Sequence, residues 1–167
     1  GRVVIPKEIR RTLRIREGDP LEIFTSNDGE VIFKKYSPIG ELSAFAGQYA
    51  EILHKTSSRP VIVCDRDHVV SASGLPKKEL LERRISPALE ELIEERKSYI
   101  YGQQGGALLY PVEGIERPAL VEYPIISAGD VCGSILFLAD GEPTVPTEAE
   151  EKLLQAAAGF LGKQMEE

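Results

Sequence analysis

Residues 1–13 read GRVVIPKEIRRTL, and this stretch decides the fold of the first part of the chain. Residues 2–5 predict an extended segment, because β-branched side chains favour strands. Pro6 suits the first position of a helix, since its ring fixes φ near the helical value. Ile9 and Leu13 are four residues apart and would touch on a short helix. The opening stretch therefore predicts a strand followed by a helix.

A turn and a hairpin are expected to follow. Gly18 is expected to end the helix, and Asp19-Pro20 to form a turn. Residues 21–25 and 30–35 are rich in strand-forming side chains and flank Ser26-Asn27-Asp28-Gly29. A four-residue connection that contains glycine is typical of a β-hairpin. The first part of the chain is thus predicted to form a strand, a helix and a hairpin.

So small a unit can bury little apolar surface by itself. Chains below about 40 residues usually need oligomerisation or another constraint to stay folded, so size alone predicts a dimer. Ser37-Pro38 marks a boundary, because proline disfavours helix in the residue before it. We expect an N-terminal domain at residues 1–36 and a second domain at residues 38–167.

The second domain mixes helical and extended patterns. Apolar residues recur at spacings of three and four from Leu42 to Leu53, which predicts a helix to about residue 54. Thr147 and Glu150 are spaced as a capping box at the start of a terminal helix. The remaining predicted elements are helices at 77–83, 87–97 and 147–165 and strands at 60–65, 69–74, 107–110, 119–126 and 131–138. This order predicts an α+β fold with an antiparallel sheet flanked by helices.

Charge is distributed unevenly along the chain. The net charge is -7. Residues 1–36 hold eight basic and six acidic residues, a balance of +2, which leaves 12 basic and 21 acidic residues, or -9, for the rest. Within residues 1–17 the balance is +4, from six basic and two acidic residues. The N-terminal end is therefore the candidate surface for binding a polyanion.

Several classes of protein are disfavoured by the sequence. It contains neither a run of about 18 apolar residues nor a signal peptide pattern, so we expect no membrane association and a cytoplasmic location. Cys64 and Cys132 lie in apolar runs, where reduced, buried thiols are the usual finding. The spacing of Cys64, Asp65, Asp67 and His68 matches no zinc pattern. Because nucleophile, phosphate-loop and dinucleotide motifs are also missing, we expect no enzyme activity, metal or cofactor.

The motif at residues 1–13, with Gly18-Asp19 and the hairpin ending Lys34-Lys35-Tyr36, resembles the AbrB-type swapped-hairpin DNA-binding domain. From Pro38 onward the chain resembles the stage V sporulation protein T family, whose second domain is GAF-like. The resemblance implies that two N-terminal segments interleave into one dimer and that the GAF-like domains pair further into a tetramer. The family usually carries another strand, with a basic residue, ahead of this motif.

The same resemblance assigns DNA contacts. It carries the DNA-contacting arginines of the family onto Arg2, Arg10 and Arg11. Lys7 and Arg14 are added from spacing, because Lys7, Arg10, Arg11 and Arg14 would share one helix face. Like charges so spaced repel one another by about 0.2 to 0.5 kcal/mol per pair, which favours an anionic partner. The alternative is an ordinary solvated helix face.

The resemblance therefore implies a regulator of transcription that binds double-stranded DNA, with sporulation genes as its targets and either activation or repression as its effect. The resemblance also implies association with the nucleoid, in the forespore. The second domain would set the oligomeric state or respond to an unidentified small-molecule effector. One alternative is a small-molecule sensor and oligomerisation module that does not bind DNA. Another is an antitoxin, which the large second domain disfavours.

The terminal helix leaves one alternative open. Its apolar side and the apolar side of the helix at 42–54 could together form a helix bundle between subunits. Alternatively, both helices could cover the sheet of their own chain. The family resemblance favours the interface between subunits.

Overall fold

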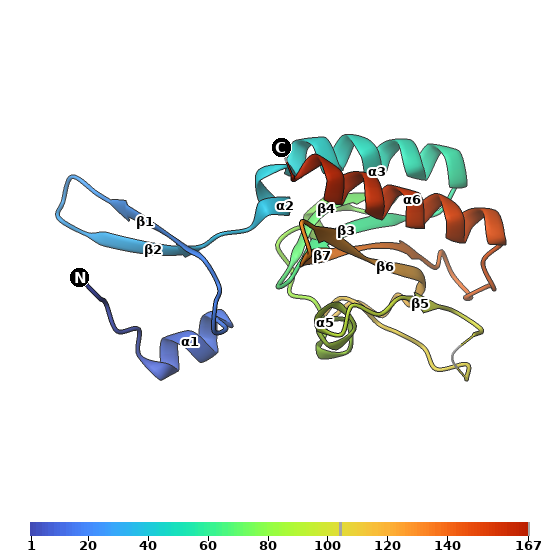
Figure 1. Cartoon of the computed structure of the whole chain (residues 1–167). Helices are drawn as coiled ribbons and strands as arrows, with labels where there is room; N and C mark the ends of the chain where they lie inside the picture. The colour runs from blue at the N-terminus through green and yellow to red at the C-terminus, as the bar shows by residue number, and fades with distance from the viewer. Residues whose placement is uncertain (104, 167) are drawn as a thin grey trace. The chain divides into compact units, whose positions relative to one another are not determined.

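The computed structural model describes residues 1–103 and 105–166, and it divides the chain into two compact units, Gly1–Ser37 and Pro38–Glu167 (Figure 1). The first unit holds helix α1 (Lys7–Leu13) and an antiparallel hairpin of β1 (Leu21–Thr25) and β2 (Val31–Lys35). The predicted hairpin is confirmed. Its turn needs Gly29, whose φ of 87° lies in the left-handed region that favours glycine.

Two expectations about the first unit are wrong. The structure assigns no strand to residues 2–5. A strand needs a hydrogen-bonded neighbour, and the two strands of this unit pair with each other instead. The helix also ends at Leu13 rather than near Gly18, because Arg14 adopts the left-handed conformation with φ 55° and ψ 43°.

The second unit is built on a five-stranded sheet with the order β4-β3-β7-β6-β5, in which every neighbouring pair is antiparallel. Its strands are β3 (Val61–Asp65), β4 (Val69–Ser73), β5 (Tyr99–Ile100), β6 (Ala119–Ser127) and β7 (Asp130–Leu138). Its helices are α2 (Pro38–Glu41), α3 (Ser43–Ser57), α4 (Lys77–Leu80), α5 (Pro87–Glu94) and α6 (Glu148–Gln164). The α+β prediction, with an antiparallel sheet flanked by helices, is confirmed.

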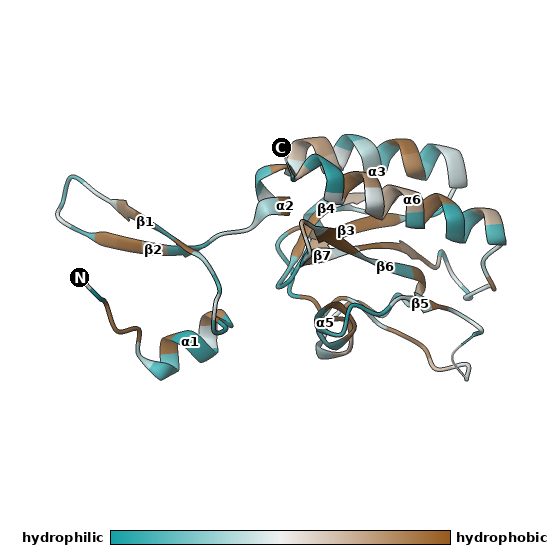
Figure 2. Ribbon diagram, viewed as in Figure 1, coloured by the Kyte–Doolittle hydropathy of each residue, from teal (hydrophilic) through white to brown (hydrophobic). Residues whose placement is uncertain are grey.

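Both faces of this sheet are buried. Along β3, Val61 and Val63 pack with α3 and α6, whereas Ile62 and Cys64 pack with α5 on the other face. Figure 2 shows the central strands mostly in hydrophobic colours and the helices in mixed colours. A strand that is buried on both faces has a continuous apolar sequence rather than an alternating one.

Helices α3 and α6 lie side by side on one face of their own sheet (Figure 1). Phe160 of α6 stacks on Tyr49 of α3 with 5.4 Å between ring centroids, and Phe45 lies 6.0 Å away. The predicted capping box is confirmed: the Thr147 hydroxyl accepts from the Glu150 amide, and the Glu150 carboxylate accepts from the Thr147 amide.

Three local predictions differ from the structure. Helix α4 ends at Leu80 because Glu82 takes a φ of 67° and donates its amide to the Val69 carbonyl of β4. Helix α5 ends at Glu94 because Arg96 takes a φ of 58° and reverses the chain. Residues 107–110 form no strand, and β5 was not predicted.

Gly162 allows α6 to lie directly on the backbone of β6. A Cβ at this position would collide with the Ile126 carbonyl oxygen. We expect Gly162→Ala to destabilise the second unit by roughly 1 to 3 kcal/mol, as overpacking does in other cores. Chemical denaturation followed by circular dichroism measures the change.

Gly159 on the same helix is the matched control, because open space surrounds it. We expect Gly159→Ala to leave stability unchanged or raise it by up to about 1 kcal/mol, through helix propensity. An equal response of both variants would contradict the close contact between helix and strand.

Candidate nucleic-acid interface

Helix α1 presents three basic side chains on one face. It starts after Pro6, whose carbonyl accepts the Arg10 amide. At 100° per residue, Lys7, Arg10 and Arg11 fall within a single sector of the helix surface, and all three are exposed. Arg10 and Arg11 also lie in the last turn, where positive charge is stabilised by the helix dipole. That stabilisation offsets part of their mutual repulsion.

Arg14 does not belong to this face. The expectation that it shares a helix face with Lys7, Arg10 and Arg11 is wrong, because the helix has already ended. Its left-handed backbone lets the Ile15 amide reach the Arg10 carbonyl at 2.8 Å and its own amide reach the Arg11 carbonyl at 3.3 Å. Arg14 therefore terminates the helix at a position where glycine is the usual residue.

Arg2 lies four residues ahead of Pro6 in an exposed segment without regular structure. The neighbouring Val3 and Val4 are exposed as well. The structure thus places Lys7, Arg10 and Arg11 together on α1, and Arg2 and Arg14 outside that helix on either side.

The opposite face of α1 is apolar and uncovered. Ile9 and Leu13 are 46% and 44% exposed. No residue of 1–37 is buried, and the structure describes this whole stretch. The apolar side of an amphipathic helix is normally covered by another element, so the exposure of Ile9 and Leu13 indicates that a covering element is missing from this unit.

The hairpin is also apolar on both of its faces. The pair Ile23 and Phe33 lies on one face, and the pair Phe24 and Ile32 lies on the other. A two-stranded hairpin alone is marginally stable in water. The first unit therefore has enough apolar side chains to form a hydrophobic core, but too few residues to bury them.

Lys35 and Asp19 join the parts of this unit through a contact that was not predicted from the sequence. The Lys35 ammonium, from the end of β2, donates to the Arg14 carbonyl at 2.9 Å and lies 3.9 Å from the Asp19 carboxylate. The same carboxylate accepts the Arg16 amide at 2.8 Å. Sequence spacing could not reveal this network, because Lys35 lies 21 residues beyond Arg14.

The candidate cluster around Cys64 has a structural explanation. Cys64 is fully buried on the α5 face of the sheet, and burial raises the pKa of its thiol well above the usual value, with further contributions from the charges of Asp65 and Glu122. The Asp65 carboxylate accepts the amides of Asp67 and His68 and so stabilises the β3–β4 turn. Among the described residues, no group of three or more metal-binding side chains could hold a metal ion.

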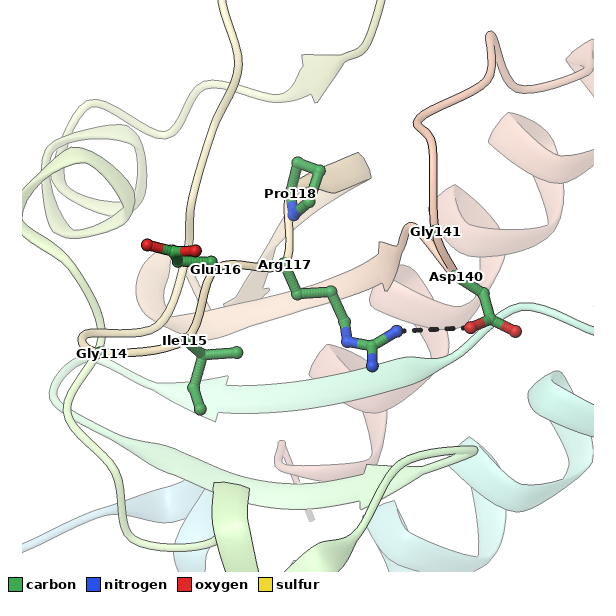
Figure 3. Close-up of a pocket in the computed structure, with 7 residues that line it drawn as sticks. All are labelled: Gly114, Ile115, Glu116, Arg117, Pro118, Asp140 and Gly141. Atoms are coloured by element: carbon green, nitrogen blue, oxygen red, sulfur yellow. Dashed lines mark ion pairs between the residues drawn. The ribbon is translucent and has the colours of Figure 1, made fainter.

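A pocket of the second unit lies beside the start of β6 and the end of β7 (Figure 3). It is lined by Gly114, Ile115, Glu116, Arg117, Pro118, Asp140 and Gly141. Arg117 is already used internally, since it pairs with Asp140 at 3.5 Å and donates to the Ala139 carbonyl at 3.0 Å. The pocket therefore identifies no class of ligand.

The described helices include none that is long and apolar enough to cross a membrane.

Two family models match this chain. Residues 41–166 match the model described as stage V sporulation protein T C-terminal, transcription factor. Residues 1–40 match the model described as antidote-toxin recognition MazE, bacterial antitoxin.

Two curated proteins of Bacillus subtilis are similar in sequence. Stage V sporulation protein T is 46% identical over 169 residues, which cover 100% of this chain and 93% of that protein. The transition state regulatory protein AbrB is 60% identical over 38 residues, which cover 23% of this chain and 38% of that protein.

Two solved structures are also similar. A type II free methionine-R-sulfoxide reductase from Thermoplasma acidophilum has a TM-score of 0.53 and 11% identity, covering 76% of this chain and 94% of that chain. At this identity the likeness shows the fold alone. A GAF domain/HD domain protein from Geobacter sulfurreducens has a TM-score of 0.47 and 16% identity, covering 76% of this chain and 95% of that chain.

Proposed function

We propose that this chain, which belongs to the stage V sporulation protein T family, is a sequence-selective DNA-binding regulator of sporulation genes. The observation that carries the proposal is the two-sided helix α1. Its exposed basic face suits a polyanion, and its exposed apolar face suits a second copy of the chain. The similarity to AbrB over the same segment supports this assignment.

The DNA-binding unit would be a dimer. Two first units would interleave so that Ile9, Leu13 and both faces of each hairpin become buried. Residues 2–5 would then find a neighbouring strand in the partner. The second units would pair two such dimers into a tetramer. The uncovered apolar surface of the first unit supports the dimer, because a dimer supplies the missing core.

Arg2, Arg10 and Arg11 would make the main DNA contacts, with Lys7 and Arg14 beside them. A guanidinium group can donate two hydrogen bonds in a fixed fork to a phosphate or to a guanine edge. The lysine ammonium is a mobile point charge that mainly grips the backbone. Arg14 would contact DNA from the loop after α1 and not from the helix.

The regulator would activate some promoters and repress others, in the cytoplasm and on the nucleoid of the forespore. The second unit would set the oligomeric state or respond to a small-molecule effector. We expect no enzyme activity, because the family model that matches residues 41–166 describes a transcription factor. Cys64 and Cys132 are also poor nucleophiles, because burial raises the pKa of each thiol.

One observation favours a second candidate function. Residues 1–40 match an antitoxin model, which would make this chain an antidote protein. The transcription factor model covers 126 residues, from 41 to 166, and so favours the regulator.

Selection from a random duplex DNA library tests sequence selectivity. The full chain is expected to enrich a motif with two related half-sites, because a two-fold symmetric dimer binds two half-sites. The Arg10→Ala, Arg11→Ala double variant serves as the comparison. If the wild-type chain enriched no motif, sequence-selective regulation would be excluded.

The dimer predicts the effect of a charge on the apolar face of α1. Leu13→Asp is expected to halve the mass of the assembly in sedimentation velocity, because burying an unpaired carboxylate in the shared core is strongly unfavourable. Val145→Asp, an exposed position in the second unit, is the control and should leave the mass unchanged. An unchanged mass for Leu13→Asp would contradict the interleaved dimer.

A further inference from the structure

The C-terminal end of α1 is fixed by a side chain from the hairpin. The helix stops at a non-glycine residue in the left-handed conformation, a backbone that costs energy and persists only when its surroundings hold it. The Arg14 carbonyl, which follows the last helical turn, accepts from the Lys35 ammonium at 2.9 Å. The hairpin and the helix are therefore connected at the residue where the helix ends.

Asp19 completes this connection. Its carboxylate accepts the Arg16 amide at 2.8 Å and faces the Lys35 ammonium at 3.9 Å. The side chains of Lys35 and Asp19 are only 21% and 10% exposed, although no residue of this unit is buried. The lysine charge is thus directed into the unit, where Asp19 and a backbone carbonyl balance it.

Lys34, the preceding residue of β2, provides a contrast. It is exposed and pairs across the hairpin with Glu22, and it points to the opposite face of the strand. Two neighbouring lysines in a basic DNA-binding segment are therefore in different environments.

We infer that Lys35 and Asp19 are positioning residues that fix the end of α1 on the hairpin and so set the orientation in which Arg10 and Arg11 meet DNA. Lys35 itself makes no phosphate contact. This inference rests on the proposed DNA binding. Arg10 and Arg11 would contact DNA directly, whereas Lys35 would hold the helix that carries them.

The experiment compares Lys35→Met, Lys35→Arg and Lys34→Met in the full chain. Duplex DNA affinity is measured by fluorescence anisotropy over a range of salt concentrations. Lys35→Met is expected to weaken binding by about tenfold or more, the scale of one lost hydrogen bond from a charged group. The slope of log affinity against log salt should stay unchanged, because the number of neutralised phosphates is unchanged. Lys35→Arg should restore most of the affinity, since a guanidinium can donate to the same carbonyl.

Two results would overturn the inference. A slope that becomes shallower by about 0.9 per lysine would make Lys35 a phosphate contact. An affinity of Lys35→Met equal to that of Lys34→Met would show that the connection does not orient the helix. If Lys35→Met fails to fold, Asp19→Asn replaces it, because the amide oxygen still accepts from Arg16 while the charge facing Lys35 is lost.

Hydrogen exchange of the Ile15 and Arg16 amides separates failure of this inference from failure of the proposed function. Faster exchange in Lys35→Met would support the contact between Lys35 and the end of α1. If the wild-type chain also bound no DNA, the DNA-binding proposal alone would be rejected. Unchanged exchange would reject the connection.

Discussion

Replacing Arg10 and Arg11 together with alanine is expected to weaken the binding of duplex DNA by about a hundredfold or more, because each arginine contact is worth about 1 to 3 kcal/mol. Both side chains lie on the exposed face of α1, and each would be present twice in a dimer. The helix itself should persist, since alanine is a strong helix former. Fluorescence anisotropy of a labelled duplex measures the loss.

The matched control removes two charges from the second unit. Lys77 and Lys78 are exposed at the start of α4, so Lys77→Ala, Lys78→Ala changes the net charge by the same amount. This variant should bind DNA nearly as well as the wild-type chain. Equal losses in the two double variants would mean that overall charge, and not the face of α1, determines binding.

Glu122 is expected to make the second unit less stable as pH rises. Its carboxyl group is fully buried in β6, and burial raises its pKa from 4.5 to about 8, although a hydrogen bond from the Ser134 hydroxyl at 2.7 Å partly opposes the shift. Its other oxygen has no hydrogen-bond partner among the residues that the structure describes. The group is therefore protonated in the folded chain near neutral pH.

Stability falls with rising pH because the folded and unfolded chains lose the Glu122 proton at different pH values. Between pH 4.5 and about 8 the unfolded chain loses this proton while the folded chain keeps it, so stability falls as pH rises. Glu122 alone should make the second unit about 2 kcal/mol less stable at pH 8 than at pH 6. Above about pH 8 both states are ionised, and the loss levels off.

Glu122→Gln tests this expectation, because glutamine is nearly isosteric and does not ionise. Denaturation at pH 6 and pH 8 should show a smaller loss of stability in the variant than in the wild-type chain. Glu116→Gln, at an exposed position, is the control and should keep the wild-type dependence. Parallel pH profiles for the wild-type chain and Glu122→Gln would contradict a protonated Glu122.

Elements with a strong local signal were predicted well. The hairpin of the first unit follows from two strand-forming runs around a glycine turn, and α6 from its capping box. The alternation of Val61, Ile62, Val63 and Cys64 between the two faces of the sheet is a direct result of strand geometry.

Elements that depend on distant partners were not predicted. Strand β5 has only two residues and exists because Tyr99 and Ile100 pair with β6. Residues 107–110 are apolar, but Leu109 is buried from a loop, and its carbonyl accepts from Ala119. The run at 2–5 pairs with no strand among the residues that the structure describes. In each case a tertiary contact decides the outcome, and sequence periodicity does not contain it.

Some residues of the candidate site could likewise be predicted from local spacing, and others could not. Lys7, Arg10 and Arg11 could be grouped from helical spacing alone. Arg14 could not, because the helix end depends on a left-handed backbone that glycine usually marks. Lys35 and Asp19 meet only after the hairpin has folded back toward α1.

The most direct test of the central claim is a salt titration of the affinity of the full chain for duplex DNA. We expect the affinity to fall by at least about a hundredfold between about 50 and 200 mM salt, because Arg10 and Arg11 of the two copies alone would supply about four phosphate contacts and the other basic residues would add to them. The Arg10→Ala, Arg11→Ala variant should show a much shallower dependence. No binding at low salt, or an affinity that does not change with salt, would contradict the claim that the basic face of α1 binds DNA.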